Sequence, residues 1–325
     1  MTTYKEINGT NIEAVSSDPA NPVEGQVWYN TTTNVVKGLG VTTAGAWSSG
    51  GSVNTARRWA GGVGIQTAAL IAGGGNPGIS ALNESYNGSA WTEVNDLNTT
   101  GQNRIGSGTQ TAAIVAGGGS GGPVDRAQTE SWNGTSWAEV NDLNTGRSGS
   151  SGTPSGTQTA ALYFGGAPNS VLNESWNGTS WTEVNDLNNG FNSGGGGGTQ
   201  PSAIKFGGAG PNVNSETWNG TSWTEVANLN TGRNNLSGTA TSSTAAICYG
   251  GELPPGGAAA QTEEWNGTAW TEVADLSLGR DSIASGTGPA VAAMAITGYD
   301  RTALTAVTEE WTDAGAPLVQ TFTDS

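Results

Sequence analysis

Short apolar runs that end in glycines recur along most of this chain. One example, Thr111–Ala116, reads TAAIVA and is followed by Gly117–Gly119. A continuous apolar run between turn residues is typical of a strand that is buried on both faces. The small side chains in this run favour an inner strand, where neighbouring sheets crowd together. The preceding segment, Arg104–Ser107, is expected to pair with the run across the turn at Gly108–Gln110.

A hairpin with two aromatic residues follows each apolar run. In the same unit, Thr129–Trp132 and Ser136–Val140 are joined by a turn that contains Asn133-Gly134. Asn-Gly is a strong hairpin signal because both residues tolerate positive φ. Side chains alternate between the two faces of a strand, so Glu130 and Trp132 are expected on one face. The pattern predicts a unit of four short antiparallel strands, which needs neighbouring units for its stability.

A sixteen-residue phrase that carries this hairpin occurs five times. The copies lie at 83–98, 129–144, 173–188, 215–230 and 262–277, and a partial copy, TEEW, stands at 308–311. Self-similarity at a period in the forties indicates a stack or ring of identical units. We expect the tryptophan on the second strand of each hairpin to be buried between units, at about 1.5–3 kcal/mol or more per side chain. These structural tryptophans are Trp91, Trp137, Trp181, Trp223 and Trp270.

Together, an arginine, a di-glycine and an aromatic pair in each unit resemble the kelch repeat. The arginine position is filled by Arg58 (or Arg57), Arg104, Arg147, Arg233 and Arg280. The di-glycines are Gly73-Gly74, Gly117-Gly118, Gly165-Gly166, Gly207-Gly208 and Gly250-Gly251. Two positions depart from the pattern, with Gly190-Phe191 in place of Gly-Arg and Thr297-Gly298 in the last unit. The resemblance covers about residues 45–315. It implies an all-β, kelch-like β-propeller with four-stranded blades, in which these arginines are structural.

The tryptophans on the second strand of each hairpin also indicate the number of blades. Trp47 precedes the five named above, and no partner tryptophan follows Trp311. We therefore expect six blades, with Gly45–Ser49 pairing with the last blade and closing the ring from its N-terminal side. Seven blades are the alternative, if residues 26–49 and the C-terminal tail build separate hairpins. The predicted domains are an N-terminal arm over residues 1–44 and a propeller over residues 45–325.

The segment Pro22–Gly38 lies outside the repeat and reads as a hairpin with a Thr/Asn-rich turn. It resembles segments of tailed-phage fibre and other virion structural proteins, in which Pro-x-x-Gly-x-x-Trp-Tyr-Asn precedes a lysine-containing return strand. The resemblance implies that residues 1–44 anchor the propeller to a larger assembly. An ordinary hairpin that caps the ring is the alternative interpretation.

Composition argues against several classes of function. The chain has 27 acidic and 11 basic residues, a formal net charge of −16 and no histidine. Nucleic-acid binding requires a basic surface, so no nucleic-acid partner is expected. No stretch of 18 apolar residues is present, so no membrane insertion is expected. The absence of histidine removes the commonest general base and transition-metal ligand. The single Cys248 stands in an apolar strand pattern and is expected to be a small core residue.

The two faces of the predicted ring differ in sequence. Alternating strand direction places the 1–2 and 3–4 turns on one face, and the 2–3 loops and 4–1 crossings on the other. The turns repeat as Gly-Thr-Gln-Thr and Asn-Gly-Ser/Thr, whereas the loops vary. Variable loops on a rigid frame often bind ligands, although drift without function would give the same variability. The candidate ligand-binding or partner-binding residues on this loop face are Asn76, Ile79, Asp125, Arg126, Asn169, Asn212, Glu252, Leu253, Tyr299, Asp300 and Arg301.

No catalytic residue, metal site or cofactor is predicted. The glutamate of the Glu-x-Trp motif, such as Glu130, recurs in successive units. This recurrence fits an inter-blade hydrogen bond or an arginine partner better than a single catalytic site. The loops contain no twelve-residue EF-hand pattern. Kelch-type copper enzymes need histidine, so their activity is not carried over to this chain.

We expect a non-enzymatic virion or extracellular protein, such as a phage tail fibre, that recognises a host surface glycan or protein through its loop face. The alternative is a capsid or tail decoration subunit, or an adaptor, that binds only other virion structural proteins. A hydrolase that uses carboxylates alone is a third hypothesis.

Overall fold

The computed structural model describes residues 12–23, 25–41, 44–121, 125–210, 212–284, 286–315 and 317–322. The chain divides into two compact units. One unit, Ala46–Thr312, contains the repeats, and the other combines the segment before Ala46 with the segment after Thr312. Both are built from β-strands, and the helical element among the described residues is the short 3-10 turn η1, Ala290–Ala292. None of the described helical segments has the length and apolar character to cross a membrane.

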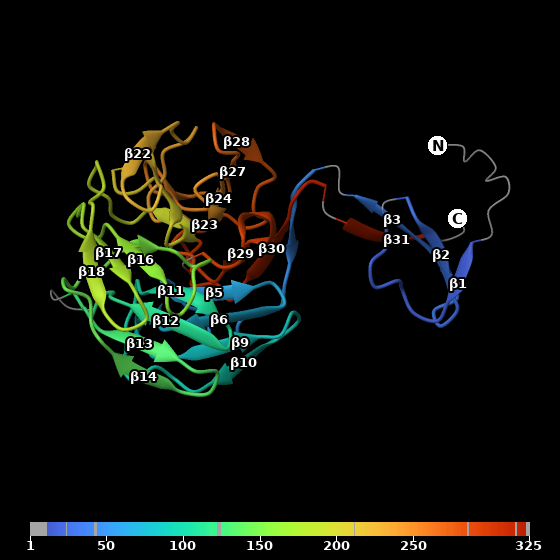
Figure 1. The fold of residues 1–325 in the computed structure, drawn as a ribbon, viewed down its shortest axis with the longest axis horizontal. Helices are drawn as coiled ribbons and strands as arrows, with labels where there is room; N and C mark the ends of the chain where they lie inside the picture. Colours follow the sequence, from blue (N-terminus) through green and yellow to red (C-terminus); the bar gives the residue numbers. More distant parts are fainter. Residues whose placement is uncertain are drawn as a thin grey trace. The chain divides into compact units, whose positions relative to one another are not determined.

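The unit that contains the repeats, Ala46–Thr312, is a six-bladed β-propeller, and its blades surround a common axis in Figure 1. Blade 1 contains β5 (Gly61–Ile65), β6 (Ala68–Ala72), β9 (Asn83–Tyr86) and β10 (Trp91–Val94). Blade 2 contains β11 (Ile105–Thr109), β12 (Ala112–Ala116), β13 (Thr129–Trp132) and β14 (Trp137–Val140). Blade 3 contains β15 (Ser151–Gly152), β16 (Ala161–Phe164), β17 (Asn173–Trp176) and β18 (Trp181–Val184).

Blades 4 and 5 follow the same order, and blade 6 combines both ends of the repeat region. Blade 4 contains β19 (Gly195–Thr199), β20 (Ser202–Phe206), β21 (Ser215–Trp218) and β22 (Trp223–Val226). Blade 5 contains β23 (Ser237–Ser242), β24 (Ala245–Tyr249), β27 (Thr262–Trp265) and β28 (Trp270–Val273). Blade 6 contains β29 (Met294–Ile296), β30 (Thr308–Thr312) and β4 (Ala46–Ser49). The predicted N-terminal strand is present, because β4 pairs antiparallel with β30 and places Trp47 opposite Trp311.

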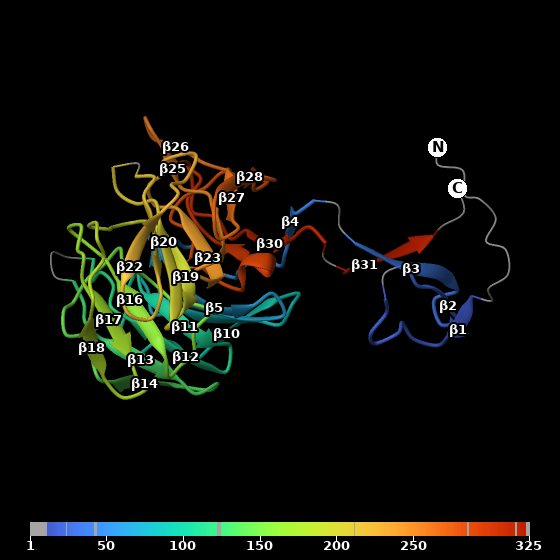
Figure 2. The same cartoon turned by 45° about the horizontal axis from the view of Figure 1, so that its top comes forward.

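Two of the 2–3 loops form small hairpins on the propeller. Strands β7 (Gly75–Asn76) and β8 (Gly78–Ile79) belong to blade 1, and β25 (Glu252–Leu253) and β26 (Gly257–Ala258) belong to blade 5. Figure 2 shows the β25–β26 hairpin at the margin of the propeller. These loops are therefore ordered extensions of the second and third strands of their blades.

The predicted domain boundary at the C-terminus is wrong, because the tail does not belong to the propeller. The second unit is one sheet in the order β1 (Glu13–Val15), β2 (Val27–Asn30), β3 (Val35–Val41) and β31 (Pro317–Phe322). Strand β31 pairs antiparallel with β3. The outer position of blade 6 is already occupied by β4, so the tail has no place in the last blade. The expected hairpin between residues 26 and 38 is present as β2 and β3, but the alternative with seven blades is not observed in the described residues.

A buried tryptophan and one carboxylate organise the second unit. Trp28 is fully buried, and its indole Nε1 donates to Asp18 Oδ1 at 3.0 Å. Asn30 Nδ2 donates to the same oxygen, and Lys37 Nζ lies 2.7 Å from Asp18 Oδ2. These donors, with Lys37 foremost, hold the pKa of Asp18 at about 2. Asp18 thus fixes the long segment between β1 and β2 on the hairpin.

Each blade of the propeller carries one buried glutamate on its third strand. The cation that pairs with this glutamate differs between blades. The glutamates are almost fully inaccessible to solvent and each lies beside a buried cation. The pairs are Arg57–Glu84, Arg104–Glu130, Arg147–Glu174, Lys205–Glu216, Arg233–Glu263 and Arg280–Glu309. A buried charge without a partner is strongly destabilising. The pairing therefore explains why the glutamate and a cation recur together.

Two blades supply the cation from an unusual position. In blade 4, Phe191 takes the arginine position and Lys205, on β20, reaches Glu216 at 3.1 Å instead. Burial lowers the pKa of Lys205, and Glu216 opposes that shift. In blade 2, Gly101 occupies the arginine position, and the Arg104 guanidinium fills the space where a side chain at 101 would lie. In blade 1 the partner is Arg57, which leaves Arg58 outside the structural set.

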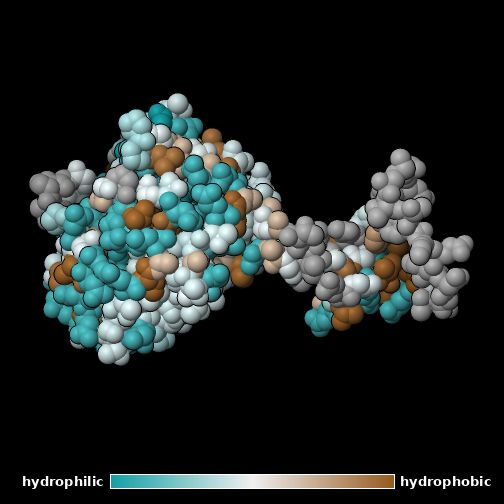
Figure 3. Space-filling model, turned by 90° about the horizontal axis from the view of Figure 1, so that it is seen from above, coloured by the Kyte–Doolittle hydropathy of each residue, from teal (hydrophilic) through white to brown (hydrophobic). Residues whose placement is uncertain are grey.

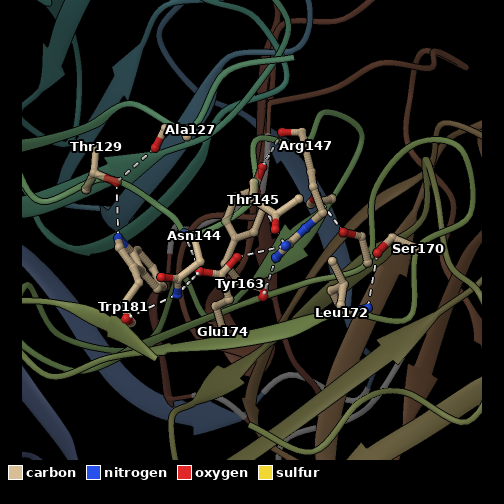
Figure 4. A network of polar contacts seen from close by, with 12 residues as sticks. Ala127, Thr129, Asn144, Thr145, Arg147, Tyr163, Ser170, Leu172, Glu174 and Trp181 are labelled. Carbon is tan, nitrogen blue, oxygen red and sulfur yellow. Dashed lines mark hydrogen bonds and ion pairs between the residues drawn. The ribbon is translucent and has the colours of Figure 1, made fainter. Parts of the chain in front are cut away.

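The same glutamates also join neighbouring blades. In four of the five phrases the last residue is an asparagine that donates its backbone and side-chain nitrogens to the glutamate of the next blade, as Asn144 does to Glu174 at 2.8 and 2.9 Å. The fifth phrase ends in Ser277, whose backbone nitrogen donates to Glu309 at 2.8 Å. Figure 4 shows this network, in which Arg147 and Asn144 approach Glu174 from two sides. On the opposite face, the turn glutamine bonds to the preceding blade, as Gln110 Nε2 does to Ser85 Oγ at 2.8 Å. The repeated phrase is thus a set of inter-blade contacts.

The tryptophans are buried as expected and most of their indoles reach the preceding blade. Trp181 Nε1 donates to Thr129 Oγ1 at 3.1 Å, and Trp270 Nε1 donates to Ser215 Oγ at 3.2 Å. The indole nitrogens of Trp137 and Trp223 lack such a partner. In the blades before them, Asn83 and Asn173 stand where the others have serine or threonine. Cys248 is also buried, and burial raises the pKa of its thiol to about 12.

Removal of the substitute cation in blade 4 should expose the energetic role of these pairs. We expect Lys205→Met to lower the free energy of unfolding by about 3–5 kcal/mol, because Glu216 loses its cation while buried. The measurement is urea unfolding of the full chain. Glu225→Gln, at the exposed position opposite Glu216 on β22, is the matched control and should change stability by less than about 0.5 kcal/mol. A Lys205→Met protein as stable as the parent would contradict this account.

Candidate binding site on the loop face

The six 4–1 crossings meet at the propeller axis in a ring of backbone hydrogen bonds. One residue from each blade forms this axial ring, and its members are Trp59, Asn103, Gly149, Ser193, Asn235 and Ser282. Five neighbouring pairs are joined by an N–H···O=C bond of 2.8–3.0 Å, including Trp59 to Ser282, which links blade 1 to blade 6. All six residues have φ between 50° and 63°. Asparagine, serine and glycine suit such a conformation better than a large side chain does.

The ring surrounds a small axial cavity of about 60 Å³ that all six blades line. Its lining residues include Trp59, Asn103, Ser150, Ser193 and Asn235, and Arg104 is the charged member of the lining. These groups are mostly polar and uncharged. The cavity is too small for a whole ligand, but it can receive one end of a ligand that lies on the loop face.

Comparison of equivalent positions shows that the loop face is not symmetrical. The residue before each ring member is Arg58, Gln102, Ser148, Asn192, Asn234 and Asp281, in blade order. The residue that directly follows each di-glycine, or Thr297-Gly298 in blade 6, is Gly75, Gly119, Ala167, Ala209, Glu252 and Tyr299, in blade order. Blades 2, 3 and 4 carry small or neutral residues at both positions. Charged and aromatic residues are concentrated in the sector of blades 5, 6 and 1.

These residues form one cluster, which we call the axial site: Arg58, Trp59, Glu252, Asp281, Tyr299 and Arg301. Arg301 connects two blades, since its Nη2 lies 2.9 Å from Glu252 Oε2 and its Nε lies 2.8 Å from Asp281 Oδ2. The backbones of Asp281 and Tyr299 exchange two hydrogen bonds of 2.9 and 3.0 Å. Ser282 Oγ donates to Asp281 Oδ1 at 2.5 Å. The carboxylates are thus held in fixed positions.

Asp281 is the most deeply buried carboxylate of the axial site. Its side chain is only 3% exposed, whereas that of Glu252 is 28% exposed. Burial raises the pKa of Asp281, while Ser282, Arg301 and Arg58 oppose the shift. A buried carboxyl with a specific charged partner beside a cavity is a feature of functional sites.

The aromatic side of the axial site is built around a strained tryptophan. Trp59 has φ of 58°, although bulky residues rarely adopt positive φ. The Arg58 guanidinium carbon lies 3.8 Å from the centroid of the Trp59 ring and 5.5 Å from that of Tyr299. Every other member of the axial ring is asparagine, serine or glycine. A residue that is costly for the backbone at this one position points to a role on the surface.

The structure brings together three of the residues predicted from the sequence. Glu252, Tyr299 and Arg301 lie in the axial site. Asp300 is nearby in sequence, but its Oδ1 accepts bonds from Thr302 and Ala303 and stabilises a local turn. Leu253 lies in the β25–β26 hairpin. The sequence comparison of loops overlooked Arg58, Trp59 and Asp281, because they belong to short crossings beside the repeated arginine.

The remaining predicted residues are distributed over other blades and do not form one site. Asn76 and Ile79 lie in the β7–β8 hairpin of blade 1. Asp125 forms a backbone bridge to Gly119, and the Arg126 backbone bonds to Gly118 in blade 2. Asn169 has φ of 101°, and Asn212 Oδ1 accepts from the Asn214 backbone. For Asn169 and Asn212 these features shape loops.

The opposite face is less uniform than its repeated turns predict. The Gly-Thr-Gln-Thr turn is intact in blade 2, at Gly108–Thr111, and in blade 3, at Gly156–Thr159, where Pro154-Ser155 precede it. It is altered in the other four blades, as at Gly288-Pro289 in blade 6. Ser155 Oγ donates to Gly288 O at 3.4 Å, so the two segments touch. A wide hollow of about 520 Å³ lies on this face, and its lining residues carry no charge. The expectation that both turns of this face repeat from blade to blade therefore fails for the 1–2 turn.

The described residues hold no cluster of three histidine, cysteine or carboxylate groups suited to a metal ion. No protein-family model matches the chain, and no curated protein matches it. It is similar to a solved structure titled "Structure of YjhT", with a TM-score of 0.65 and 12% sequence identity. The match covers 84% of this chain and 100% of that chain. At this identity the likeness supports the β-propeller fold alone.

Relief of the strain at Trp59 should stabilise the propeller. We expect Trp59→Asn to raise the free energy of unfolding by about 1 kcal/mol, because asparagine tolerates positive φ. Chemical denaturation of the full chain measures the change. The reverse substitution, Asn235→Trp, places tryptophan at the equivalent position in blade 5 and should destabilise the protein. If Trp59→Asn lowers stability as much as Asn235→Trp does, the tryptophan is a packing residue and its assignment to a surface role is wrong.

Proposed function

We propose that this propeller is a non-enzymatic binding module that recognises a saccharide on its loop face. The observation that carries the proposal is the concentration of charged and aromatic side chains at the axial site in blades 5, 6 and 1. The equivalent positions of blades 2, 3 and 4 have small neutral residues. The ligand would lie across this sector and direct one end into the axial cavity.

The chemistry of the axial site suits a ligand with many hydroxyl groups. Glu252, which is 28% exposed, offers carboxylate oxygens, and Arg301, which is 31% exposed, offers guanidinium donors. Hydroxyl groups both donate and accept, so they can bond to both kinds of group. Trp59 and Tyr299 add apolar surface against which the carbon-bound hydrogens of a sugar ring can pack. Convergent polar groups beside aromatic surface are typical of small-molecule sites.

A binding role also fits the state of the two carboxylates. Arg301 lies within 3 Å of both Asp281 and Glu252. Hydrolysis by two carboxyl groups needs one free acid and one free base or nucleophile on either side of the bond. A shared arginine holds these groups to each other instead. Binding without turnover is therefore the function that this geometry favours.

The second unit supports the proposal of a virion protein that is anchored by its N-terminal region. Its sheet leaves large apolar side chains exposed, and Figure 3 shows hydrophobic patches on it. These residues are Ile12, Val23, Val319 and Phe322, which are 43%, 67%, 43% and 40% exposed. With the phage-like pattern of Pro22–Gly38, they support attachment to another virion structural protein. The propeller would then display its loop face to a host surface glycan.

A glycan array with the purified full chain tests the proposal. We expect selective binding to a set of related saccharides. Glu252→Gln should reduce binding by about tenfold, the effect expected when one hydrogen bond to a charged group is weakened. Glu183→Gln, at an exposed position of β18 in blade 3, is the matched control and should bind as the parent does. Release of free sugar from bound glycans, or equal losses in both variants, would contradict the proposal.

A further inference from the structure

Almost all the basic residues that the structure describes form ion pairs with acidic residues. The sequence has 27 acidic and 11 basic residues. Six cations are buried against the glutamates of the blades. Lys37 pairs with Asp18, and Arg301 pairs with Glu252 and Asp281. Among the described residues, Arg58 and Arg126 are the two cations without a carboxylate within 4 Å. An unpaired arginine in so acidic a chain requires an explanation.

From this distribution we infer that Arg58 is an anion-recognising residue, and that the saccharide of the proposed function carries a carboxylate. The inference rests on the proposed function for the saccharide, whereas the anion site itself rests on Arg58. Arg58 borders the axial site beside Trp59, whereas Arg126 lies in the 2–3 loop of blade 2.

The Arg58 guanidinium is fixed before any ligand arrives. Its backbone exchanges two hydrogen bonds with Gly75, of 2.8 and 3.1 Å, in a bridge between the crossing and the β7 strand. Its guanidinium carbon lies over the Trp59 ring at 3.8 Å and near the Tyr299 ring at 5.5 Å. Stacking engages the flat face of the group and leaves its N–H donors at the edge. A planar fork of this kind matches a carboxylate in a bidentate arrangement.

The strain at Trp59 fits the same role. The neighbouring blades place asparagine or serine at this ring position, where no arginine precedes it. Tryptophan at positive φ brings its ring under the Arg58 guanidinium, and this contact is worth about 0.5–1 kcal/mol or more at an exposed site. An ordered arginine loses less conformational entropy when it binds, which favours affinity. The unusual ring residue and the unpaired cation thus explain each other.

Neutral polar residues of the axial ring, which also contains Trp59 next to Arg58, complete an environment for one end of an acidic sugar. Asn103, Ser193 and Asn235 line the axial cavity from three blades. The carboxyl of Asp281 is already compensated by Arg301, whose Nε lies 2.8 Å from Asp281 Oδ2. The sector as a whole has two arginines, Arg58 and Arg301, and two acidic residues, Glu252 and Asp281. A ligand carboxylate at Arg58 would therefore meet a site that is close to electrically neutral.

Calorimetry with a matched pair of sugars tests the inference. The probes are methyl glucuronide, which carries a carboxylate, and methyl glucoside, which does not. We expect the full chain to bind the acidic sugar at least tenfold more tightly, and Arg58→Met to remove that preference while binding to the neutral sugar persists. Arg58→Lys should retain part of the preference. Arg126→Met is the matched control and should leave both affinities unchanged.

The outcomes separate the inference from the proposed function. Equal affinity for the two sugars in the parent chain, or an equal loss of both in Arg58→Met, would overturn the inference and leave saccharide binding intact. A second measurement does not depend on saccharides: an NMR titration with acetate, following the Nε–H signal that is missing in Arg58→Lys. A saturable shift supports the anion site even if neither sugar binds. No shift with acetate or glucuronide would overturn it.

Discussion

The buried glutamate on the third strand of each blade is the interaction on which the propeller depends. It is out of contact with water, so it needs a cation. In five of the six blades it also accepts hydrogen bonds from an asparagine that precedes the blade, such as Asn144, and in blade 6 it accepts one from Ser277. Loss of one partner from a buried ion pair costs about 3–5 kcal/mol. Each blade is therefore tied to the next through a carboxylate that cannot remain unpaired. The constraint fixes the charge, not the position from which the cation comes, as Arg104 and Lys205 show.

The repeat predicted the ring, the number of blades and the β4 strand, because a four-stranded unit with exposed tryptophans must pack against copies of itself. Other features depended on contacts that spacing does not reveal. Arg57 and Arg58 are adjacent in sequence, and the ion pair with Glu84 identifies Arg57 as the structural arginine. The C-terminal tail matches no repeat, so the sequence does not indicate that β31 pairs with β3 in the other unit. Lys205 gave no signal, since it lies in an otherwise apolar strand.

The candidate site was only partly predictable for a related reason. Variability in long loops drew attention to residues such as Asn169 and Asn212, which shape the loops in which they lie. The cluster itself joins those loops to the short crossings, where Trp59 and Asp281 follow the structural arginine directly. Once the blades are aligned on the axial ring, the departures in blades 5, 6 and 1 are evident. Function in a repeat protein of this kind is expected where one sector abandons the residues that the others share.

The most direct test of the central constraint is a rescue experiment in blade 4. Lys205→Val alone should strongly lower the thermal unfolding temperature, because Glu216 is left as an unpaired buried charge. Adding Phe191→Arg restores a cation at the position used by Arg147 and Arg233, and the account predicts that the unfolding temperature of the double variant returns toward that of the parent. A double variant as unstable as Lys205→Val alone would contradict the claim that each buried glutamate requires one cation, whichever position supplies it.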